Sequence, residues 1–571
     1  MDTNELYTLW KSKAVDDSDL IDELNSIQGN DEEIYDRFYR CLEFGTAGLR
    51  GVIGAGTNRM NIYNVRLATQ GLANYLNQRY DQSAVAISYD SRIKADLFAK
   101  EAARTLAGNG IKVYLTAELQ PTPVLSFLVR NLKCKAGIMI TASHNPAKYN
   151  GYKCYGDDGC QMTDDGANSV YNEIQKLDCF EDIKLADFDK AISDGVIEYV
   201  QDSEYQTYLD NVQAQQIHKD ACIGSALKVV YTPLNGAGNK LVRAILDRIG
   251  VENVHIVKEQ ENPDGNFTTC PYPNPEFKEA LELGLKLCDE LKPDLLLATD
   301  PDSDRVGIAA KDGDSYRLIT GNETGIMLTD YILSQRTALG TLPKNPIIVK
   351  TIVTSIMINK LCEKYRAELR NVLTGFKYIG EQILGLEKKG EENRYVFGFE
   401  ESYGYLAGTY VRDKDAVVAS MLICEMAAYY KKQGKTLSQV IDEMYDQYGY
   451  YINKTLNFAF EGAQGMKKMQ EIMTELRENT PAEIAGFKVI KVDDYLKSVS
   501  TDIVNGQKTE INLPKSNVIG FSLEGENAVI VRPSGTEPKI KLYVTAVGNS
   551  EENAKELSDK LAKAGEALMG V

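Results

Sequence analysis

Apolar and polar positions along the chain repeat one pattern three times: a β-rich segment, a polar turn, an amphipathic helix and a second apolar segment. The first copy starts with VAISYDSR at Val85, continues through a helix expected from about Ala95 to Leu106 and ends in IKVYLT. The second starts with KVVYTPLNGAG at Lys228, and the third with PIIVKTIVTS at Pro346. Strands that alternate with helices of this length predict mostly parallel sheets with helices on their faces, which is the α/β class.

The C-terminal part of the chain follows a different pattern. NVIGFSLEG, NAVIVRPSG and KIKLYVTAV are short apolar segments separated by turns, as in successive strands. A helix should follow, opened by Ser550 and with Leu557, Leu561, Ala564 and Leu568 on one face. This part is therefore expected to form a separate and smaller α+β domain.

A chain of 571 residues is too long for one hydrophobic core. We expect three consecutive related α/β domains with mixed, mostly parallel sheets, followed by the α+β domain. The expected ranges are 1–205, 206–320, 321–450 and 451–571. The longest apolar stretch, Ala416 to Tyr430, contains Glu425 and is too short to span a bilayer, so it predicts a buried helix.

Composition narrows the possible partners and locations. The net charge of −18 and the sequence pI near 4.9 disfavour binding to nucleic acid or to anionic membranes. The N-terminus has no apolar segment behind a basic start, so we expect no signal peptide and a cytoplasmic protein. The 10 cysteines form no C-x-x-C pair and there are 3 histidines, so no zinc site is indicated. Any phosphate would have to be bound by local cations, a metal and backbone donors.

The first segment with chemical groups is GIMITASHNPAKYNGYK, in which an apolar strand runs into a loop with Ser143, Asn145 and Lys153. A serine at the end of a strand is held in place and presented to solvent or ligand, which suits a nucleophile. A capped loop without catalytic function is the alternative. His144 does not complete a hydrolase triad, because adjacent side chains on a strand are expected to point apart.

The second segment, DLLLATDPDSDRVGIAA, places Asp300, Asp302 and Asp304 at alternate positions between two apolar strands. Three carboxylates in so short a loop repel one another unless a hard cation binds between them. An EF-hand is excluded, because its glycine and glutamate positions hold Arg305 and Lys311 here. A solvated acidic turn is the alternative, but the flanking strands favour a magnesium site.

Two further loops carry groups that could bind a sugar phosphate. VFGFEESYGY holds Glu400 and Ser402 after a strand, and such groups can bridge neighbouring sugar hydroxyls. VRPSGTEPKIK offers the Arg532 guanidinium, the Ser534 hydroxyl and the freely rotating backbone of Gly535, a combination suited to a phosphate dianion. A plain β-turn is the alternative for the second loop.

These four segments, in this order, resemble the α-D-phosphohexomutase family, which includes phosphoglucomutases and phosphomannomutases. The resemblance extends from FGTAGLRG near Phe44 to RPSGTEP near the C-terminus. EFGTAGLRG, TGFKYIG and VRDKDA look most like the larger phosphoglucomutase and phosphopentomutase branch. The sequence departs from the family at Pro301, where many members have glycine, and at Phe399, where glycine is common.

The resemblance implies a role for each matching residue. Ser143 would carry the phosphoryl group, with His144 bracing its loop. The other implied sets are the magnesium ligands Asp300, Asp302 and Asp304 with a phosphoserine oxygen; the basic residues Arg50, Lys153 and Arg305 around the transferring phosphate; the sugar contacts Glu400 and Ser402; the phosphate-binding Arg532, Ser534, Gly535 and Thr536; and the further substrate contacts Lys377 and Lys414.

The implied activity is that of a phosphoglucomutase, with glucose 1,6-bisphosphate as intermediate and activator, inside a central cleft that excludes water. A phosphopentomutase or a phosphomannomutase is the alternative within the family. A sugar-phosphate sensor without catalysis and a metal-dependent phosphatase are alternatives from other classes. The general base stays open between Lys414 and the carboxylates. The expected partners are small sugar phosphates, and the chain is expected to be a monomer or a weak homodimer.

Overall fold

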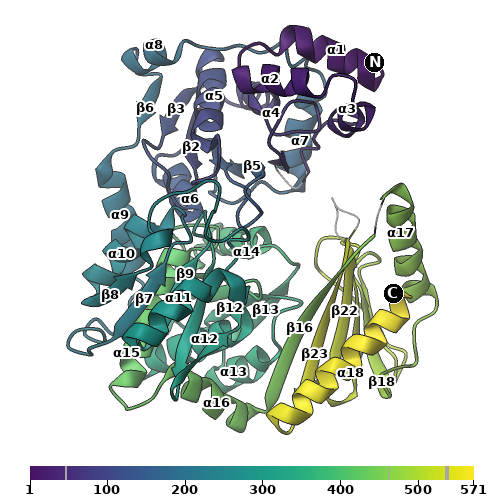
Figure 1. Cartoon of the computed structure of the whole chain (residues 1–571). Helices are drawn as coiled ribbons and strands as arrows, with labels where there is room; N and C mark the ends of the chain where they lie inside the picture. Colours follow the sequence, from purple (N-terminus) through teal and green to yellow (C-terminus); the bar gives the residue numbers. More distant parts are fainter. Residues whose placement is uncertain (46–47, 461, 534–538, 571) are drawn as a thin grey trace. The chain divides into compact units, whose positions relative to one another are not determined.

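The computed structural model describes residues 1–45, 48–460, 462–533 and 539–570 (Figure 1). These residues form two compact units. The first unit comprises Met1–Gly321 and Ile379–Thr436, and the second comprises Asn322–Tyr378 and Leu437–Val571. Among the described residues, no helix combines the length and the apolar character needed to cross a bilayer.

The first unit opens with three short helices that the sequence analysis did not predict, drawn in purple in Figure 1. They are α1 (Thr3–Lys13), α2 (Ser18–Ser26) and α3 (Asp31–Phe38). Each begins at an Asp or Asn whose side chain accepts a backbone N–H of the first turn. Trp10 is buried and makes edge contacts with Phe38, Tyr63 and Phe180, so these helices share the core of the sheet that follows.

A six-stranded sheet follows in the order β1-β5-β4-β2-β3-β6. Its strands are β1 (Gly48–Val52), β2 (Ala84–Tyr89), β3 (Lys112–Leu115), β4 (Ala136–Ile140), β5 (Tyr149–Gly156) and β6 (Ile197–Tyr199). Its helices are α4 (Ile62–Asn77), α5 (Ala95–Gly108), α6 (Thr122–Asn131), α7 (Asp164–Ile174), α8 (Phe188–Ser193) and α9 (Asp202–Gln213). Strands β4, β2, β3 and β6 are parallel, whereas β5 returns antiparallel to β4 and pairs with β1.

A second sheet in the first unit has the order β11-β10-β9-β7-β8. Its strands are β7 (Lys228–Thr232), β8 (Asn253–Ile256), β9 (Leu295–Thr299), β10 (Val306–Asp312) and β11 (Ser315–Ile319), with helices α10 (Gly238–Arg248) and α11 (Lys278–Leu291). Strands β8, β7 and β9 are parallel, but β9 and β10 form an antiparallel hairpin. The aspartate loop is the tip of that hairpin.

The rest of the first unit contains an antiparallel strand pair and a helix that is buried along most of its length. The pair is β14 (Tyr395–Glu400) with β15 (Gly404–Ala407), and the helix is α15 (Ala416–Lys431). Helix α14 (Lys377–Glu387) precedes them in the chain. The apolar stretch from Ala416 is thus a buried helix, as its composition predicts.

The second unit contains a parallel strand pair and a large antiparallel sheet. The pair is β12 (Ile347–Thr351) with β13 (Glu368–Val372), accompanied by α12 (Gly321–Ala338), α13 (Met357–Tyr365) and α16 (Leu437–Tyr448). The sheet has the order β16-β23-β22-β21-β18-β19-β20, and it shares a hydrophobic core with α17 (Gly462–Glu478) and α18 (Glu551–Met569). Figure 1 draws these two helices in green and yellow. Its strands are β16 (Tyr450–Ala459), β18 (Phe487–Asp494), β19 (Val499–Asp502), β20 (Lys508–Glu510), β21 (Ile519–Leu523), β22 (Ala528–Pro533) and β23 (Lys539–Gly548), and β17 (Glu483–Ile484) pairs with β18.

The predicted repeat and the α+β C-terminal part are confirmed. The strand and helix of each copy are β2 and α5, β7 and α10, and β12 and α13. The predicted C-terminal strands are β21, β22 and β23, and Ser550 caps α18 by accepting the Asn553 N–H at 3.2 Å. The sheets are mixed, as expected, with antiparallel hairpin returns at β5, β10 and β11.

Candidate active site

Ser143 lies directly after β4 in a turn that strains its backbone. Its φ is +52°, a left-handed conformation that is rare for a residue other than glycine. Its side chain is buried, and its Oγ donates a hydrogen bond of 2.9 Å to Oδ2 of Asp300. The strand-end serine predicted from the sequence therefore contacts the predicted aspartate loop directly.

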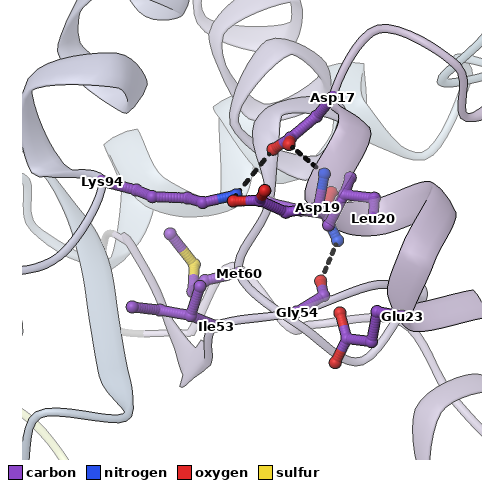
Figure 2. A pocket seen from close by; sticks show the side chains of 9 residues that line it. Asp17, Asp19, Leu20, Glu23, Ile53, Gly54, Met60 and Lys94 are labelled. Carbon is purple, nitrogen blue, oxygen red and sulfur yellow. Dashed lines mark hydrogen bonds and ion pairs between the residues drawn. The ribbon is translucent and has the colours of Figure 1, made fainter. Parts of the chain in front are cut away.

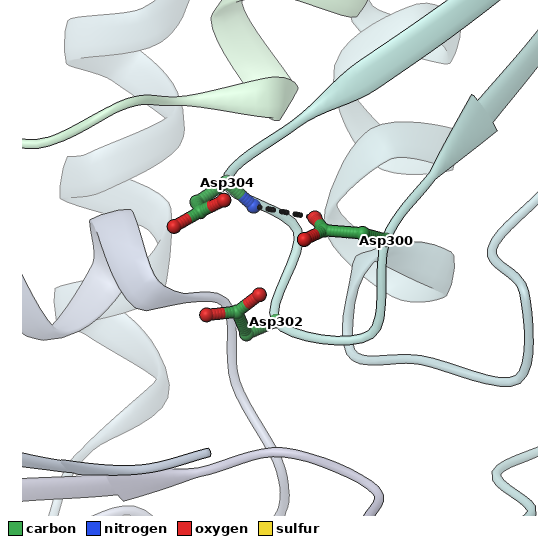
Figure 3. A group of neighbouring side chains, drawn as sticks. All are labelled: Asp300, Asp302 and Asp304. Atoms are coloured by element: carbon green, nitrogen blue, oxygen red, sulfur yellow. Dashed lines mark hydrogen bonds between the residues drawn. The ribbon is translucent and has the colours of Figure 1, made fainter. Parts of the chain in front are cut away.

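The three aspartates form one buried cluster at the tip of the β9–β10 hairpin (Figure 3). Each offers one carboxylate oxygen, and these oxygens lie within 4.8 Å of one another. Oδ1 of Asp300 accepts the backbone N–H groups of Asp304 at 3.1 Å and of Arg305 at 3.0 Å, which fixes the turn. Ser303 adopts a φ of +50° in the same turn. Alternate positions in a tight hairpin thus converge on one point.

Two lysines complete the surroundings of this cluster. Nζ of Lys153, on β5, lies 2.8 Å from Oδ2 of Asp302 and 3.7 Å from Oδ2 of Asp304. Nζ of Lys414 lies 3.1 Å from Oδ2 of Asp304. The hairpin return of β5 is what brings Lys153 back to the loop of Ser143, because β4 and β5 pair residue by residue.

The cluster fits a hard cation. Oδ1 of Asp302 and Oδ1 of Asp304 are buried and have no hydrogen-bond partner among the described residues. Burial and the neighbouring carboxylates raise the pKa of Asp300 well above its ordinary value, and also raise that of Asp304. Burial would raise the pKa of Asp302 too, but Lys153 lowers it below its ordinary value. Buried oxygens that lack donors, held together against repulsion, are what a divalent cation requires.

Arg305 and the loop of Glu400, Glu401 and Ser402 lie at the same hairpin. Nη1 of Arg305 lies 2.8 Å from Oε1 of Glu276, in the loop before α11. The Val306 N–H donates to the Tyr403 carbonyl at 3.1 Å, which places the loop after β14 against the start of β10. Gly404, next to this loop, leaves room for the Lys414 side chain, because a Cβ there would lie 2.2 Å from Cδ of Lys414. The structure therefore brings Glu400 and Ser402 to the neighbourhood of the aspartates.

His144 requires a correction. The side chains of Ser143 and His144 do not point apart: Nδ1 of His144 lies 3.2 Å from Oγ of Ser143. The alternation rule holds for extended strands, and the left-handed φ of Ser143 breaks it. Burial, followed by the charges of Arg305 and Arg50, lowers the pKa of His144 well below its ordinary value. The imidazole is therefore neutral near pH 7.

Phe399 and Pro301, the two residues that depart from the family pattern, are both buried. Phe399 is fully buried, with its ring centroid 5.7 Å from that of Phe397 and 6.4 Å from that of Tyr405. Pro301 packs against Gly236, where a Cβ would lie 2.5 Å from the proline Cα. Phe399 therefore packs in an aromatic cluster, and the backbone of Pro301 packs against Gly236.

Some predicted site residues are not brought together by a described contact. Lys377, at the start of α14, and Arg532, on β22, belong to the second unit. The hydroxyl of Tyr543 lies 3.2 Å from Nη1 of Arg532. Ser534, Gly535 and Thr536 lie outside the described residues. Arg50 is exposed on β1, close enough to His144 to lower its pKa.

Four residues that the sequence analysis did not single out also contact the site. Thr122 donates its hydroxyl to Oδ2 of Asp302 at 2.9 Å. Arg92 and Thr141 bind the backbone of Ser143, and Asp90 accepts the hydroxyl of Thr141. The polar residues of Y-D-S-R, at the end of a buried strand, were the sequence signal available for Asp90 and Arg92.

A separate pocket of about 250 Å³ lies between α2 and the segment that follows β1 (Figure 2). Its polar lining includes Asp17, Asp19, Glu23 and Lys94. Nζ of Lys94 lies 2.8 Å from an oxygen of Asp17 and 2.8 Å from one of Asp19. Glu23 accepts the Ala55 N–H at 2.6 Å. These charged groups of the pocket therefore all have partners in the protein.

Comparisons with known proteins give one consistent result. Four family models match: the phosphoglucomutase/phosphomannomutase alpha/beta/alpha domains I (residues 42–180), II (205–313) and III (320–448), and the C-terminal domain (507–564). A phosphoglucomutase of Staphylococcus saprophyticus is 38% identical over 514 residues, which cover 90% of this chain and 92% of that protein. A phosphoglucomutase of Staphylococcus aureus (strain USA300) is 37% identical over 521 residues, 91% of this chain and 92% of that protein.

Solved structures share the fold. A phosphoglucomutase from Paramecium, pp63/parafusin in its open form, has a TM-score of 0.68 at 18% identity and covers 92% of this chain and 94% of its own. A phosphoglucomutase/phosphomannomutase family protein of Burkholderia thailandensis has a TM-score of 0.66 at 18% identity, with coverages of 92% and 97%.

Together, the fold and these relatives define an enzyme of the isomerase class that transfers a phosphoryl group within its substrate. The chain belongs to the phosphoglucomutase/phosphomannomutase family of α-D-phosphohexomutases.

Proposed function

We propose that this chain interconverts glucose 1-phosphate and glucose 6-phosphate through a phosphorylated Ser143 and a bound glucose 1,6-bisphosphate. One observation carries the proposal: Oγ of Ser143 lies 2.9 Å from Asp300, inside a cluster of three carboxylates beside Lys153 and Lys414. The glucose assignment is supported by the relatives named phosphoglucomutase, at 37–38% identity over most of the chain.

In the proposed cycle, the bond between phosphorus and Ser143 Oγ breaks as a bond to the free sugar hydroxyl forms, and that hydroxyl loses its proton. The bisphosphate then turns, and its other phosphate returns to Ser143. Lys153 and Arg305 would bind the equatorial oxygens of the transferring group. Magnesium, held by Asp300, Asp302 and Asp304, would neutralise part of the developing charge when bound.

The remaining predicted residues are proposed to bind the substrate. Glu400 and Ser402 would contact the sugar hydroxyls, and Lys377 and Lys414 would provide further contacts. Arg532, Ser534, Gly535 and Thr536 are proposed to bind the phosphate that is not reacting. These roles rest on the family resemblance.

The experiment is an assay of four substrates with peptide mapping. Glucose 1-phosphate should give the highest kcat/KM among the 1-phosphates of glucose, mannose, ribose and N-acetylglucosamine. Ser143 should carry phosphate in part of the purified protein, and Ser143→Ala should lose at least ~100-fold in rate. Ser420→Ala is a control, because Ser420 is also buried, within α15, and its hydroxyl has no hydrogen-bond partner among the described residues.

Other results would contradict one part of this proposal, either the substrate, the reaction or the nucleophile. A higher kcat/KM for ribose 1-phosphate or mannose 1-phosphate would make the chain a phosphopentomutase or a phosphomannomutase. Release of free sugar and inorganic phosphate would indicate a phosphatase. Full activity in Ser143→Ala, with phosphate mapped elsewhere, would overturn the proposed nucleophile.

A further inference from the structure

Arg92 is a buried residue that contacts the loop of Ser143 at both ends. It follows β2 and has a fully buried side chain. Nη1 donates to the carbonyls of Pro146 at 3.1 Å and Tyr149 at 2.9 Å. Nη2 donates to the carbonyls of Ser143 and Asn145. One guanidinium therefore binds four backbone carbonyls of the segment from Ser143 to Tyr149.

The backbone N–H of Ser143 is held by two successive hydrogen bonds that lead to Asp90, which follows β2 as Arg92 does. The N–H of Ser143 donates to Oγ1 of Thr141 at 2.8 Å. The Thr141 hydroxyl in turn donates to Oδ2 of Asp90 at 2.6 Å. Oδ1 of Asp90 accepts the N–H of Arg92 at 3.0 Å, and Oδ2 lies 3.4 Å from Nε of the same arginine. The N–H and the C=O of Ser143 are thus both held, directly or through Thr141, by one Asp–Arg pair.

These hydrogen bonds hold a residue whose backbone conformation is strained, since the φ of Ser143 is +52°. A serine in the left-handed region costs roughly 1 kcal/mol relative to its preferred conformations, and such a conformation persists only when the surroundings determine it. Arg92 is itself fixed, since its guanidinium carbon lies 5.1 Å from the Phe267 ring centroid. Gly265 packs so closely on Ile93 that a Cβ there would lie 2.7 Å from the Ile93 nitrogen. The group that holds the loop is therefore anchored in the second sheet's domain as well as in its own.

We propose that Asp90, Arg92 and Thr141 form a backbone clamp that fixes the conformation of Ser143, and that they are positioning residues for phosphoryl transfer. The proposal rests on the proposed function, in which Ser143 accepts and donates the phosphoryl group. In-line transfer requires the nucleophile oxygen at a defined point, and a displacement of about 1 Å costs on the order of 100-fold in rate. The clamp contributes no group to the reacting atoms.

The test compares Thr141→Val with Thr141→Ser. Valine keeps the shape of threonine and removes the hydroxyl that links Ser143 to Asp90, whereas serine keeps the hydroxyl and removes the methyl group. The measured quantity is the rate at which glucose 1,6-bisphosphate phosphorylates dephosphorylated protein, followed by rapid quench and intact mass. We expect Thr141→Val to be slowed by ~30-fold or more and Thr141→Ser to stay within ~3-fold of wild type.

Arg92→Lys and Arg66→Met provide the second comparison. Lysine keeps the charge but cannot bind four carbonyls, so Arg92→Lys should be slowed by roughly 100-fold. Arg66 is also buried, but it pairs with Asp16 and Glu101 away from this loop. Arg66→Met should lower the melting temperature and leave the phosphorylation rate within ~3-fold.

Contrary outcomes separate the clamp from the proposed function. If wild type accepts phosphate on Ser143 and Thr141→Val does so at the same rate, the clamp is wrong and the proposed function stands. If Thr141→Ser is slowed as much as Thr141→Val, packing of the methyl group explains the effect and the clamp is again wrong. If wild type never carries phosphate on Ser143, the proposed function fails and the clamp fails with it.

Discussion

The two oxygens of Asp302 have different surroundings, and this difference defines what the residue can bind. Oδ2 accepts hydrogen bonds from the ammonium of Lys153 at 2.8 Å and from the hydroxyl of Thr122 at 2.9 Å. Oδ1 is buried without a hydrogen-bond partner among the described residues. The carboxylate is thereby oriented with one oxygen neutralised and the other available to a cation.

Thr122→Val should therefore weaken magnesium binding by roughly 10-fold, because partners that orient a metal ligand contribute about that much to affinity. Calorimetric titration of the substrate-free protein with magnesium measures the change. Thr122→Ser keeps the hydroxyl and serves as the control, with an affinity within ~3-fold of wild type. Equal affinity in all three proteins would show that Lys153 alone orients Asp302.

Asp302→Asn tests the ligand itself. An amide removes one negative charge and leaves a neutral oxygen or an NH₂ group toward the cation, so binding should weaken by more than in Thr122→Val. The same titration, with EDTA-treated protein as the starting state, gives both affinities. An unchanged affinity in Asp302→Asn would remove this residue from the ligand set.

At the residue scale, the sequence analysis singled out the groups proposed to carry chemistry and missed those that hold them in place. Ser143 and the aspartates stand out because reactive residue types occur between apolar strands. Thr122 lies 180 positions from Asp302, and Thr141 lies 51 positions from Asp90. Such pairs are set by how the sheets pack, and no local spacing encodes them.

At the element scale, helix α15 shows how one residue supports both a helix and the site. Asp415 is its N-cap and accepts the N–H groups of Val417 at 2.8 Å and Val418 at 3.0 Å. The hydroxyls of Tyr208 and Tyr410 donate to the same carboxylate at 2.9 and 2.6 Å. Because Asp415 directly follows Lys414, this cap also fixes the position of the lysine backbone.

Asp415→Ala should lower the free energy of unfolding of the first unit by about 3 kcal/mol, since it removes a cap and leaves two buried tyrosine hydroxyls without an acceptor. Asp187→Ala is the matched control. Asp187 caps the short helix α8 through a single hydrogen bond of 2.8 Å to Lys190 N–H, and its loss should cost about 1 kcal/mol. Urea denaturation of both variants gives the two values. Equal losses would show that the tyrosines find other partners.

Other elements differ in how well their sequences predict them. Helix α15 is predicted because its apolar residues leave no polar face. Helices α1 to α3 were missed because they are short and largely polar, and their stability comes from caps and from the packing of Trp10. The positions of the antiparallel strands β5 and β10 within the mixed sheets were not predicted, because alternation of strands and helices does not specify where a hairpin replaces a crossover.

At the scale of the whole molecule, the order of the four functional segments carried the family assignment, and the four family models agree with that order. The domain boundaries near 205, 320 and 450 stay a prediction. The phosphate-binding loop from Ser534 to Thr536 lies outside the described residues, so its role also stays a prediction. What the structure adds is the gathering of Ser143, the aspartates, Lys153 and Lys414 within the first unit.

This location predicts which part of the chain magnesium stabilises. A ligand that binds only the folded state at 100 times its Kd adds about 2.7 kcal/mol of stability. The cluster of Asp300, Asp302 and Asp304 lies entirely in the first unit, so only the unfolding of that unit should respond. We expect differential scanning calorimetry to resolve two transitions and magnesium to raise one of them by a few degrees.

Asp302→Asn identifies the responding transition, because loss of a ligand should abolish the magnesium shift while leaving the other transition where it is. EDTA should lower the same transition in wild type and have no effect on the variant. A shift of both transitions by magnesium, or an equal shift in Asp302→Asn, would place the stabilising cation outside the aspartate cluster. In that case Oδ1 of Asp302 and Oδ1 of Asp304, which are buried without a hydrogen bond among the described residues, would need another donor, such as a protonated carboxyl.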